Sequence, residues 1–382
     1  MSSARKKRIL VYVDSPGWAY DNLARHIRAA FAKDFDWYVD YTFCHRFLSR
    51  PSFIERVKTD LLNLFRFVYR LVLFRPFAQL SCWTLFGHKL TFFWQRKFEV
   101  NGTLFSRRVL PFWMKYDLVI QLDYYFDRHA KLVFRSHRLV KGIYFDGFPP
   151  VGCNFDYIRK INPQEIKSIS YFVDEYLSYT DAVLCGSPSI SRRFTELGLK
   201  TFFCTAIRDE HIFEGRDVRL KPMSETLIIG WTGNPRRAFK HFDTIIRPVI
   251  LKLRKSGLDI ELKTQFSGSY DSLPKFYSDV DIVLIASDRD AGPSMFAEAS
   301  LSNVPSISTK VGFPEYVVEH MRNGLLVDLT EDAFEHAIRV LYFNRELLFM
   351  MSKRIRGDYL SKMGNELLME NWRKMFCYMG LY

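Results

Sequence analysis

The chain has 382 residues, with 55 Lys and Arg against 42 Asp and Glu, and a formal net charge of +13. This length predicts two domains, since one domain usually takes ~100–200 residues. The hydrophobic content of 48% excludes a mainly disordered chain. The six cysteines lie far apart, with no CxxC pair and no histidine at metal-ligand spacing. This pattern argues against a zinc site or a disulfide framework and is typical of a reducing cytosol.

No segment has the pattern of a signal peptide or a membrane-spanning helix. The basic N-terminus runs directly into a strand-like segment at residues 9–13, without an apolar signal-peptide core. No stretch reaches the ~18 uncharged apolar residues that a transmembrane helix needs. We therefore expect a soluble or peripheral protein in the cytoplasm.

Positive charge gathers in residues 41–115, which hold 13 Lys and Arg, three Asp and Glu, and 18 of the 62 aromatic residues. Basic side chains interleaved with Phe and Trp are typical of a surface that lies on anionic lipid headgroups. They are also typical of a groove for single-stranded nucleic acid, in which rings stack on bases. A helical part of the core with outward-reaching arginines is the third reading. Charge clustering alone does not choose among them.

Strand-like apolar segments alternate with amphipathic segments in the first half, which predicts a parallel α/β sheet. The expected helices are one that ends at residue 30 and two more at residues 164–178 and 188–197. The expected strands are residues 8–14, 117–122, 142–145, 182–185 and 201–204. Residues 41–115 interrupt this alternation and are expected to be a mostly helical insertion.

A polar stretch at residues 214–225 separates a second alternating series. Its expected strands are residues 227–230, 259–263, 281–286 and 306–309. Its expected helices are residues 240–256, 273–278, 294–302, 332–343, 346–360 and 365–382. We predict an N-terminal domain over residues 1–215, a C-terminal domain over residues 216–360, and a last helix within residues 361–382 that crosses back to the first domain. Ligands of doubly wound sheets bind at the carboxyl ends of strands, so a cleft between the domains is the expected site.

The most informative stretch begins at Tyr277, where a buried strand is expected to end in a turn that carries Asp290 and Gly292. A helix is predicted to begin near Pro293, with Glu298 inside it. The turn amides and the helix N-terminus suit a phosphate, and the two carboxylates suit sugar hydroxyls. A second glycine turn is expected at residues 311–313. One such turn alone is more typical of ordinary strand–turn–helix punctuation.

In order and spacing, these segments resemble the C-terminal domain of the family 4 glycosyltransferases (glycosyl transferases group 1), which have the GT-B fold. Asp281 opens the strand, and Asp290 and Glu298 have the spacing of the family's E-x7-E. The further matching segments are Ala286-Ser287 for "PS", Asn303-Val-Pro305, Gly312–Glu315 and Asn323–Val327. Upstream, residues 179–187 are similar to the family's "ADAVLAVS", and residues 204–213 lie where "PNGVD…F" closes the first domain. The resemblance covers about residues 117–357 and implies two Rossmann-like domains that face a central cleft.

The resemblance implies a role for each residue of the turn. Glu298 is expected to bind both ribose hydroxyls of the nucleotide. Asp290, one methylene shorter than the family's usual glutamate, is expected to accept hydrogen bonds from the donor sugar. The turn from Gly292 through Pro293 to Ser294 is expected to contact phosphate or sugar.

A basic stretch after residue 230 corresponds to the family's "G-R-x…K-G". Gly233 lies in its turn, and Asn234 occupies the usual arginine position, so Arg236 or Arg237 is expected to substitute. Lys240 matches the lysine within one residue. These cations suit a departing nucleoside diphosphate, whose charge must otherwise meet a metal. An exposed basic helix start is the alternative.

The acceptor side is expected in the first domain. Asp14 and Gly17 follow the first strand and correspond to the family's acceptor loop, which has two glycines. The family's histidine aligns with residue 145 or 146 and is therefore absent. Asp146 is expected to act in its place, with a structural turn aspartate as an equal alternative. His129 and His137 are further candidates.

The sequence Asp288-Arg289-Asp290 has the D-x-D form that binds Mn²⁺ in another glycosyltransferase fold. That role needs the motif after an N-terminal nucleotide-binding sheet, whereas here it lies in the last third of the chain. We therefore expect no metal site and no cofactor.

The resemblance implies a retaining, metal-independent glycosyltransferase of the hexosyltransferase type (EC 2.4). It is expected to move a sugar from a nucleotide-diphosphate sugar to a glycan or lipid-linked acceptor, in surface polysaccharide or lipopolysaccharide synthesis. Residues 41–115 would contact the inner face of an anionic membrane. Two alternatives stay open: transfer to nucleic acid, such as modified DNA bases, and a non-catalytic protein that binds nucleotide sugar. The second arises because Asp290, Asn234 and the absent histidine depart from the family pattern.

Overall fold

The computed structural model describes residues 5–13, 19–41, 97–100, 103–106, 115–122, 136, 138–144, 169–268 and 270–382. The chain divides into two compact units. Unit 1 combines Met1–Ile143, Asn154–Leu184 and Met375–Tyr382, and unit 2 combines Tyr144–Cys153 and Cys185–Lys374. This division into two units does not test the domain boundaries expected at residues 215 and 360, which stay predictions.

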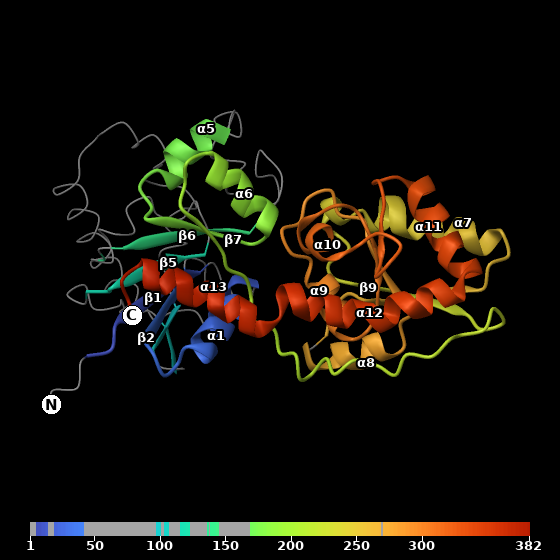
Figure 1. The fold of residues 1–382 in the computed structure, drawn as a ribbon, viewed down its shortest axis with the longest axis horizontal. Helices are drawn as coiled ribbons and strands as arrows, with labels where there is room; N and C mark the ends of the chain where they lie inside the picture. Colours follow the sequence, from blue (N-terminus) through green and yellow to red (C-terminus); the bar gives the residue numbers. More distant parts are fainter. Residues whose placement is uncertain are drawn as a thin grey trace, which may run out of the picture. The chain divides into compact units, whose positions relative to one another are not determined.

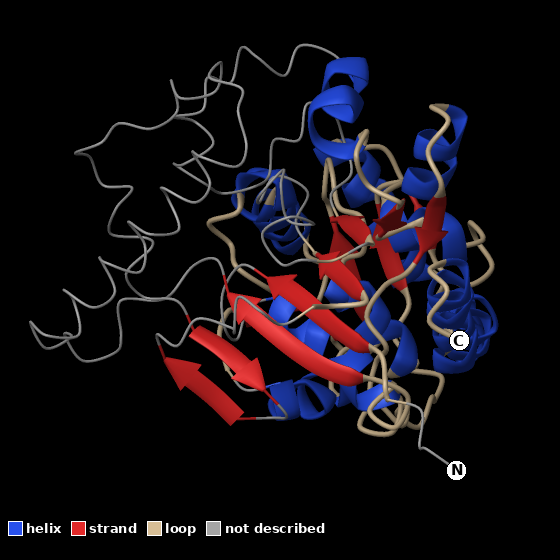
Figure 2. Ribbon diagram, turned by 90° about the vertical axis from the view of Figure 1, so that its left-hand side faces the viewer, coloured by secondary structure: helices blue, strands red, loops and turns tan. Residues whose placement is uncertain are grey.

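The first sheet has eight strands in the order β4-β3-β2-β1-β5-β6-β7-β8 (Figures 1 and 2). The strands are β1 (Arg8–Val13), β2 (Asp36–Tyr41), β3 (Lys97–Val100), β4 (Thr103–Ser106), β5 (Leu118–Gln121), β6 (Leu139–Ile143), β7 (Ala182–Cys185) and β8 (Thr201–Phe203). Strand β1 pairs in parallel with β2 and β5, and β5 pairs in parallel with β6. All residues of β5, β6 and β7 are buried, which explains their nearly continuous apolar sequences.

Four of the five strands predicted in the first half are confirmed to within one residue at each end. The prediction at residues 142–145 is wrong, because β6 begins at Leu139 and ends at Ile143. The Leu139 N–H donates to Asp181 Oδ2 at 2.6 Å, which fixes the start of this strand. Strand β2 was not predicted, although its pairing with β1 extends from Arg8 to Val13.

The prediction of a mostly helical segment at residues 41–115 is wrong for the residues that the structure describes there. Strands β3 and β4 pair antiparallel, and β3 also pairs antiparallel with β2. Strand β3 alternates polar and apolar residues, and Asn101-Gly102 separates it from β4 in the sequence. That dipeptide is the usual signal of a two-residue hairpin, so the missed signal was local. The other residues of this window lie outside the described residues, apart from Tyr41 and Lys115.

Helix α1 (Ala19–Ala30) confirms the helix expected to end at residue 30. It buries Leu23, Ala24 and Ile27, and its buried Asp21 accepts a hydrogen bond from Tyr41 Oη at 2.8 Å. Of the helix expected at residues 164–178, the structure describes the part from residue 169 onward. This part consists of α5 (Ile169–Phe172) and the π-helix η2 (Val173–Leu177) that follows it directly. Helix α6 (Pro188–Glu196) matches its prediction to within one residue.

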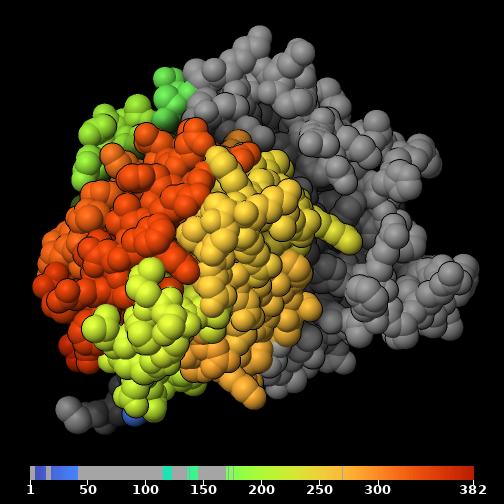
Figure 3. Space-filling model, turned by 90° about the vertical axis from the view of Figure 1, so that its right-hand side faces the viewer, coloured from blue at the N-terminus to red at the C-terminus, as the bar shows by residue number. Residues whose placement is uncertain are grey.

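The second sheet has five parallel strands in the order β10-β9-β11-β12-β13. They are β9 (Leu227–Thr232), β10 (Ile260–Gln265), β11 (Ile282–Ile285), β12 (Ser306–Ser308) and β13 (Leu325–Leu326). The helices of this half are η3 (Ala238–Lys240), η4 (Phe242–Ile246), α7 (Arg247–Lys255), η5 (Tyr270–Ser272), α8 (Leu273–Ser278), α9 (Ser294–Leu301), α10 (Gly312–Val317), α11 (Glu331–Phe343), α12 (Arg345–Met363) and α13 (Asn365–Tyr378). Apolar side chains from the strands and from α7, α9, α11 and α12 form one continuous core. Figure 3 shows the polar segment before β9, in yellow-green, exposed on the surface.

Two predicted elements of unit 2 differ from the structure. The helix expected at residues 240–256 is broken, because His241 has a left-handed backbone with φ 48° between η3 and η4. The turn expected at residues 311–313 is instead the start of α10. Among the described residues, no helix is long and apolar enough to cross a membrane.

Candidate functional site

The carboxyl ends of β9, β11 and β12 lie at one edge of the second sheet, because these strands are parallel. The segments that follow β9 and β11 carry Lys240, Asp290 and Glu298, which were predicted as site residues. Ligands of open α/β sheets bind at this edge. The side chains that these segments bring together form the candidate site.

Glu298 lies on α9 with only 4% of its surface exposed. Tyr277 Oη donates to Glu298 Oε2 at 2.9 Å and lies 3.2 Å from Thr232 Oγ1. The Tyr277 hydroxyl has a single proton, which it gives to Glu298, so Thr232 is the donor in the second contact. Arg208 Nη1 lies 4.0 Å from Glu298 Oε1. A carboxylate has about four acceptor positions, so Glu298 keeps capacity for ligand hydroxyls.

Burial raises the pKa of Glu298, because desolvation disfavours the charged carboxylate. The positive charge of Arg208, the hydrogen bond from Tyr277 and the charge of Lys240 lower the same pKa. The side chain is thus a buried acid whose ionisation depends on its neighbours.

The sequence reasoning missed Arg208, Tyr277 and Thr232 as site residues. Arg208 lies in the loop after β8, and its side chain is 13% exposed. Its Nη2 also donates to Ser294 Oγ at 3.2 Å, at the start of α9. The sequence signal for Arg208 was its place as a basic residue within residues 204–213, a stretch that the family resemblance includes.

Lys240 and Asp290 form an ion pair, with Lys240 Nζ 3.2 Å from Asp290 Oδ2 and both side chains 17% exposed. The Gly292 N–H donates to Asp290 Oδ1 at 3.2 Å, which fixes the carboxylate over its own turn. Both predicted groups are therefore present at this edge and face each other. An anionic ligand near Lys240 would compete with Asp290 for the ammonium group.

Two glycines allow the turn after β11 to pack tightly. A Cβ at Gly292 would lie 2.3 Å from the Phe313 ring, and a Cβ at Gly312 would lie 2.2 Å from Ala291 O. Gly312 also has a positive φ of 43°. Pro293 precedes α9, and no side chain among the described residues caps the start of that helix. The first N–H groups of α9 are therefore accessible to an anion.

Arg236 and Arg237 are exposed, and within the described part of the chain neither guanidinium group has a polar partner. Gly233 has a φ of 131°, and Asn234 Oδ1 accepts the Arg236 N–H at 3.0 Å. Asn234 thus shapes the turn, whereas the two arginines remain available for a ligand.

The acids of the D-x-D sequence are paired with cations. Asp288 contacts Arg289 Nε at 2.6 Å and His241 Nε2 at 3.4 Å, and these contacts lower the pKa of Asp288. Asp290 pairs with Lys240. In the described ranges, no three His, Cys, Asp or Glu side chains are grouped to hold a metal ion. Metal independence stays a prediction.

The predicted acceptor-side residues Asp14 and Gly17, the candidate Asp146, and His129 and His137 all lie outside the described residues. The donor half of the predicted site is therefore described, and the acceptor half is not.

Asp281, which opens the motif, has a structural role. It is 2% exposed, and its Oδ2 accepts the Ile228 N–H at 2.9 Å and Lys221 Nζ at 2.7 Å. Arg216 Nη1 lies 3.4 Å from its Oδ1. These contacts join the start of β11 to β9 and to the segment before it.

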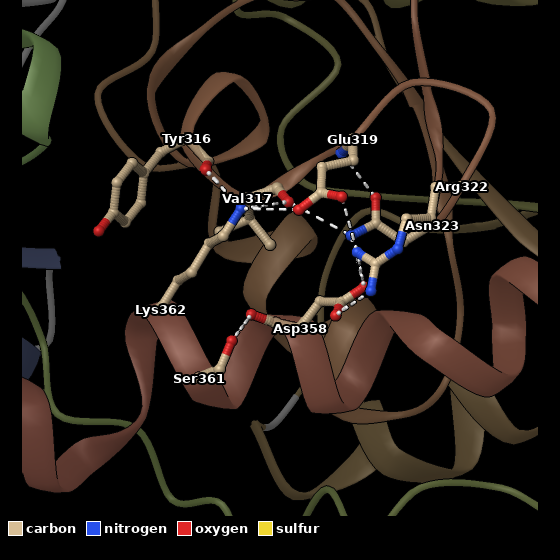
Figure 4. A network of polar contacts seen from close by, with 8 residues as sticks. All are labelled: Tyr316, Val317, Glu319, Arg322, Asn323, Asp358, Ser361 and Lys362. Atoms are coloured by element: carbon tan, nitrogen blue, oxygen red, sulfur yellow. Dashed lines mark hydrogen bonds and ion pairs between the residues drawn. The ribbon is translucent and has the colours of Figure 1, made fainter.

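Asn323, another motif position, is fully buried and also holds the chain together (Figure 4). Its Oδ1 accepts the Glu319 N–H at 2.8 Å, and its Nδ2 donates to Asp358 Oδ2 at 2.8 Å. Arg322 donates to both carboxylate oxygens of Asp358, at 3.0 and 3.1 Å. The network fastens this turn to α12.

The model of the family described as Glycosyl transferases group 1 matches residues 249–358, which include β11, α9 and both motif carboxylates. The predicted resemblance to this family is confirmed. The lipopolysaccharide core biosynthesis glycosyltransferase LpsE of Rhizobium meliloti is 20% identical over 52% of this chain and 65% of its own length. The N-acetyl-alpha-D-glucosaminyl L-malate synthase of Bacillus anthracis is 27% identical over 33% of each chain. The matched part of this chain thus spans less than two thirds of either relative.

A solved structure supports the predicted GT-B fold. The structure of Anabaena HepE in complex with UDP is similar with a TM-score of 0.56 and 13% identity, over 97% of this chain and 99% of that one. The predicted GT-B fold of two Rossmann-like sheets is confirmed.

Proposed function

We propose that this protein is a retaining, metal-independent glycosyltransferase that uses a nucleotide-diphosphate sugar. The observation that carries the proposal is a group of polar side chains at one edge of the second sheet. In this group, buried Glu298 contacts Tyr277 and Arg208, and Lys240 forms an ion pair with Asp290. A carboxylate with free acceptor positions suits two vicinal ribose hydroxyls, and cations at a helix N-terminus suit a diphosphate. The similarity to group 1 glycosyltransferases and to a UDP complex supports the same assignment.

In the proposed reaction, the bond between the sugar C1 and the diphosphate oxygen breaks, and a bond forms between C1 and an acceptor oxygen. The acceptor hydroxyl proton passes to the departing diphosphate, which supplies the base. Lys240, Arg236 or Arg237, and the α9 N-terminus stabilise the negative charge that develops on the leaving group. Asp290 accepts hydrogen bonds from the donor sugar, and Glu298 orients the ribose.

We propose a glycan or lipid-linked acceptor at an anionic membrane surface, in surface polysaccharide or lipopolysaccharide synthesis. The net charge of +10 in residues 41–115, with 18 aromatic residues, supports attraction to anionic lipid. A relative named for lipopolysaccharide core biosynthesis supports the same acceptor class.

The first test is a thermal-shift screen of the full chain against UDP-, GDP-, CMP- and dTDP-sugars, with and without EDTA. Specific binding raises Tm by mass action. We expect one nucleotide to raise Tm equally in both conditions. A shift that EDTA abolishes would contradict metal independence, and no shift with any nucleotide at millimolar concentration would overturn the proposed function.

A second test separates the acceptor classes. The bound nucleotide sugar, radiolabelled, is incubated with lipid-linked glycans in anionic vesicles or with DNA, at low and high salt. Label transfer to the lipid fraction is expected. Transfer to DNA, with binding that falls steeply with salt, would instead favour the nucleic-acid alternative.

A further inference from the structure

The loop from residue 204 to residue 213 has no helix or strand of its own, so side chains from elsewhere in unit 2 fix its position. Trp372 Nε1, on α13, donates to Thr205 O at 3.1 Å. Arg356, on α12, donates to Phe213 O. The loop is therefore held at both ends by the two C-terminal helices.

The middle of the loop is held by Asn365, the first residue of α13. Asn365 Oδ1 accepts the Arg208 N–H at 3.0 Å, and Asn365 Nδ2 donates to Arg208 O at 2.6 Å. The Asn365 N–H donates to Glu210 Oε1 at 2.6 Å. One amide side chain thus pairs with both main-chain polar groups of Arg208, and Arg208 cannot shift without breaking both bonds.

Arg208 then extends from this clasp to the start and the second turn of α9. Its guanidinium group lies 3.2 Å from Ser294 Oγ and 4.0 Å from Glu298 Oε1. The other titratable groups that act on Glu298 are Lys240, which is already paired with Asp290, and the hydroxyl groups of Tyr277, Tyr270 and Tyr359. Arg208 is therefore the cation whose placement bears most directly on Glu298.

We propose that Asn365 is a positioning residue for the nucleotide site: by clasping the main chain of Arg208, it holds the guanidinium group beside Glu298 and so sets the affinity for the nucleoside diphosphate. The inference rests on the proposed function, because it takes Glu298 as the group that binds the ribose hydroxyls. Within the described part of the chain, the polar contacts of Asn365 are with Arg208 and Glu210, and none is with Glu298 or Ser294.

The clasp acts on binding through charge. A protonated Glu298 accepts fewer hydrogen bonds than a carboxylate, so it holds ribose hydroxyls less well. When Arg208 is released, the ionised form of Glu298 loses its nearest cation, and its pKa rises further. Loss of the clasp should therefore weaken nucleotide binding and move the acid limb of the binding curve to higher pH.

The experiment measures the dissociation constant of one probe by calorimetry between pH 5.5 and 8. The probe is whichever of UDP, GDP, dTDP and CMP raises the wild-type Tm most. Asn365→Ala is expected to weaken binding about fivefold at neutral pH, since both side-chain hydrogen bonds that hold the main chain of Arg208 are lost. Arg208→Gln is expected to weaken it at least as much. Both variants should lose affinity at a higher pH than the wild type on acidification.

The matched control is Asn371→Ala, on the same helix, where no polar contact of the side chain is seen among the described residues. It should leave both the dissociation constant and its pH dependence unchanged. The double variant Asn365→Ala/Arg208→Gln should bind no more weakly than Arg208→Gln alone, because Asn365 acts through Arg208. Asn365→Asp, which keeps the acceptor and loses the donor, should lie between the wild type and Asn365→Ala and serves where the alanine variant fails to fold.

The outcomes distinguish the inference from the function on which it rests. Wild-type protein that binds none of the four nucleotides would overturn the proposed function and the inference with it. Wild-type binding with unchanged affinity in Asn365→Ala, or additive effects in the double variant, would overturn the inference alone. A lower Tm without a change in the pH profile would also assign Asn365 a purely structural role.

Discussion

Among its described residues, unit 2 contains two buried carboxylates, Asp281 at the amino ends of the strands and Glu298 at the carboxyl ends, and their surroundings differ in kind. Asp281 receives a main-chain N–H, a lysine at 2.7 Å and an arginine at 3.4 Å. Glu298 receives one tyrosine hydroxyl at 2.9 Å and has an arginine only at 4.0 Å. The first is satisfied by the protein, and the second keeps unused acceptor positions.

This difference in hydrogen-bond partners separates the two acids, whereas burial does not, since both residues are almost fully buried. Removal of a buried charge that the fold satisfies leaves its partners unpaired and therefore destabilises the protein. A buried charge that the fold leaves partly unsatisfied costs stability and gains its remaining bonds from a ligand. Substitution of Asp281 should therefore mainly lower stability, whereas substitution of Glu298 should mainly weaken nucleotide binding.

The largest effect is expected from Asp281→Ala. It leaves Lys221 and Arg216 without their partner in a site where Asp281 is 2% exposed. Removal of one member of a buried ion pair costs about 3 kcal/mol or more in the free energy of unfolding. Urea denaturation measures this loss. Nucleotide affinity of the folded fraction should remain unchanged, and a large loss of affinity would contradict the structural role.

The next effect is expected from Glu298→Gln, in which the amide oxygen can still accept from Tyr277. Loss of the charge should weaken nucleotide binding by about 2 kcal/mol, or about 30-fold, as for hydrogen bonds to a charged group. The free energy of unfolding at neutral pH should stay equal or rise. Calorimetry measures the loss of nucleotide affinity, and urea denaturation measures the free energy of unfolding. A strong loss of stability would mean that Glu298 has a structural role, as Asp281 does.

The pH dependence of the same variant sharpens the comparison. Burial raises the pKa of Glu298, so between the ordinary carboxyl value of ~4.3 and the raised value the unfolded chain releases the proton first. Within that window the ionisation of Glu298 lowers stability as pH rises. Glu298→Gln should remove this decline from the plot of unfolding free energy against pH, and an unchanged plot would show that Glu298 does not titrate there.

A smaller effect is expected from Lys240→Met, which removes the cation and keeps the aliphatic chain. Its ion pair with Asp290 is partly exposed, so stability should change little. Leaving-group stabilisation should fall by about 1.4 kcal/mol, or about tenfold in kcat. Steady-state kinetics with the bound nucleotide sugar measure this, and a change in KM alone would assign Lys240 to ground-state binding.

The smallest effect is expected from Arg236→Ala and Arg237→Ala, made separately. Both side chains are exposed, and exposed charge pairs contribute little. Each variant should weaken diphosphate binding by about threefold or less at low salt, and the difference should shrink at high salt. If one variant abolishes binding, that arginine is the substitute for the arginine that Asn234 replaces.

The sequence by itself predicted most of the parallel strands, although not β2 or β13, and it predicted three polar residues that the structure places at one edge of the second sheet. Continuous apolar runs identified β1, β5, β7 and β11, because parallel strands are buried on both faces. Asp290, Glu298 and Lys240 could be predicted because each belongs to a motif of residues that are close together in the sequence. The family resemblance then supplied the roles that we propose for them.

Only the tertiary structure decided which polar groups meet. Arg208 lies 90 residues before Glu298 and Asn365 lies 157 residues after Arg208, so no local pattern joins them. The same holds for Asp281, whose motif position gives no sign that Lys221 and Arg216 satisfy it. Burial, charge pairing and hydrogen bonds between distant segments are properties of the packed chain, and they distinguish Asp281, whose acceptor positions the fold fills, from Glu298, which keeps unused ones.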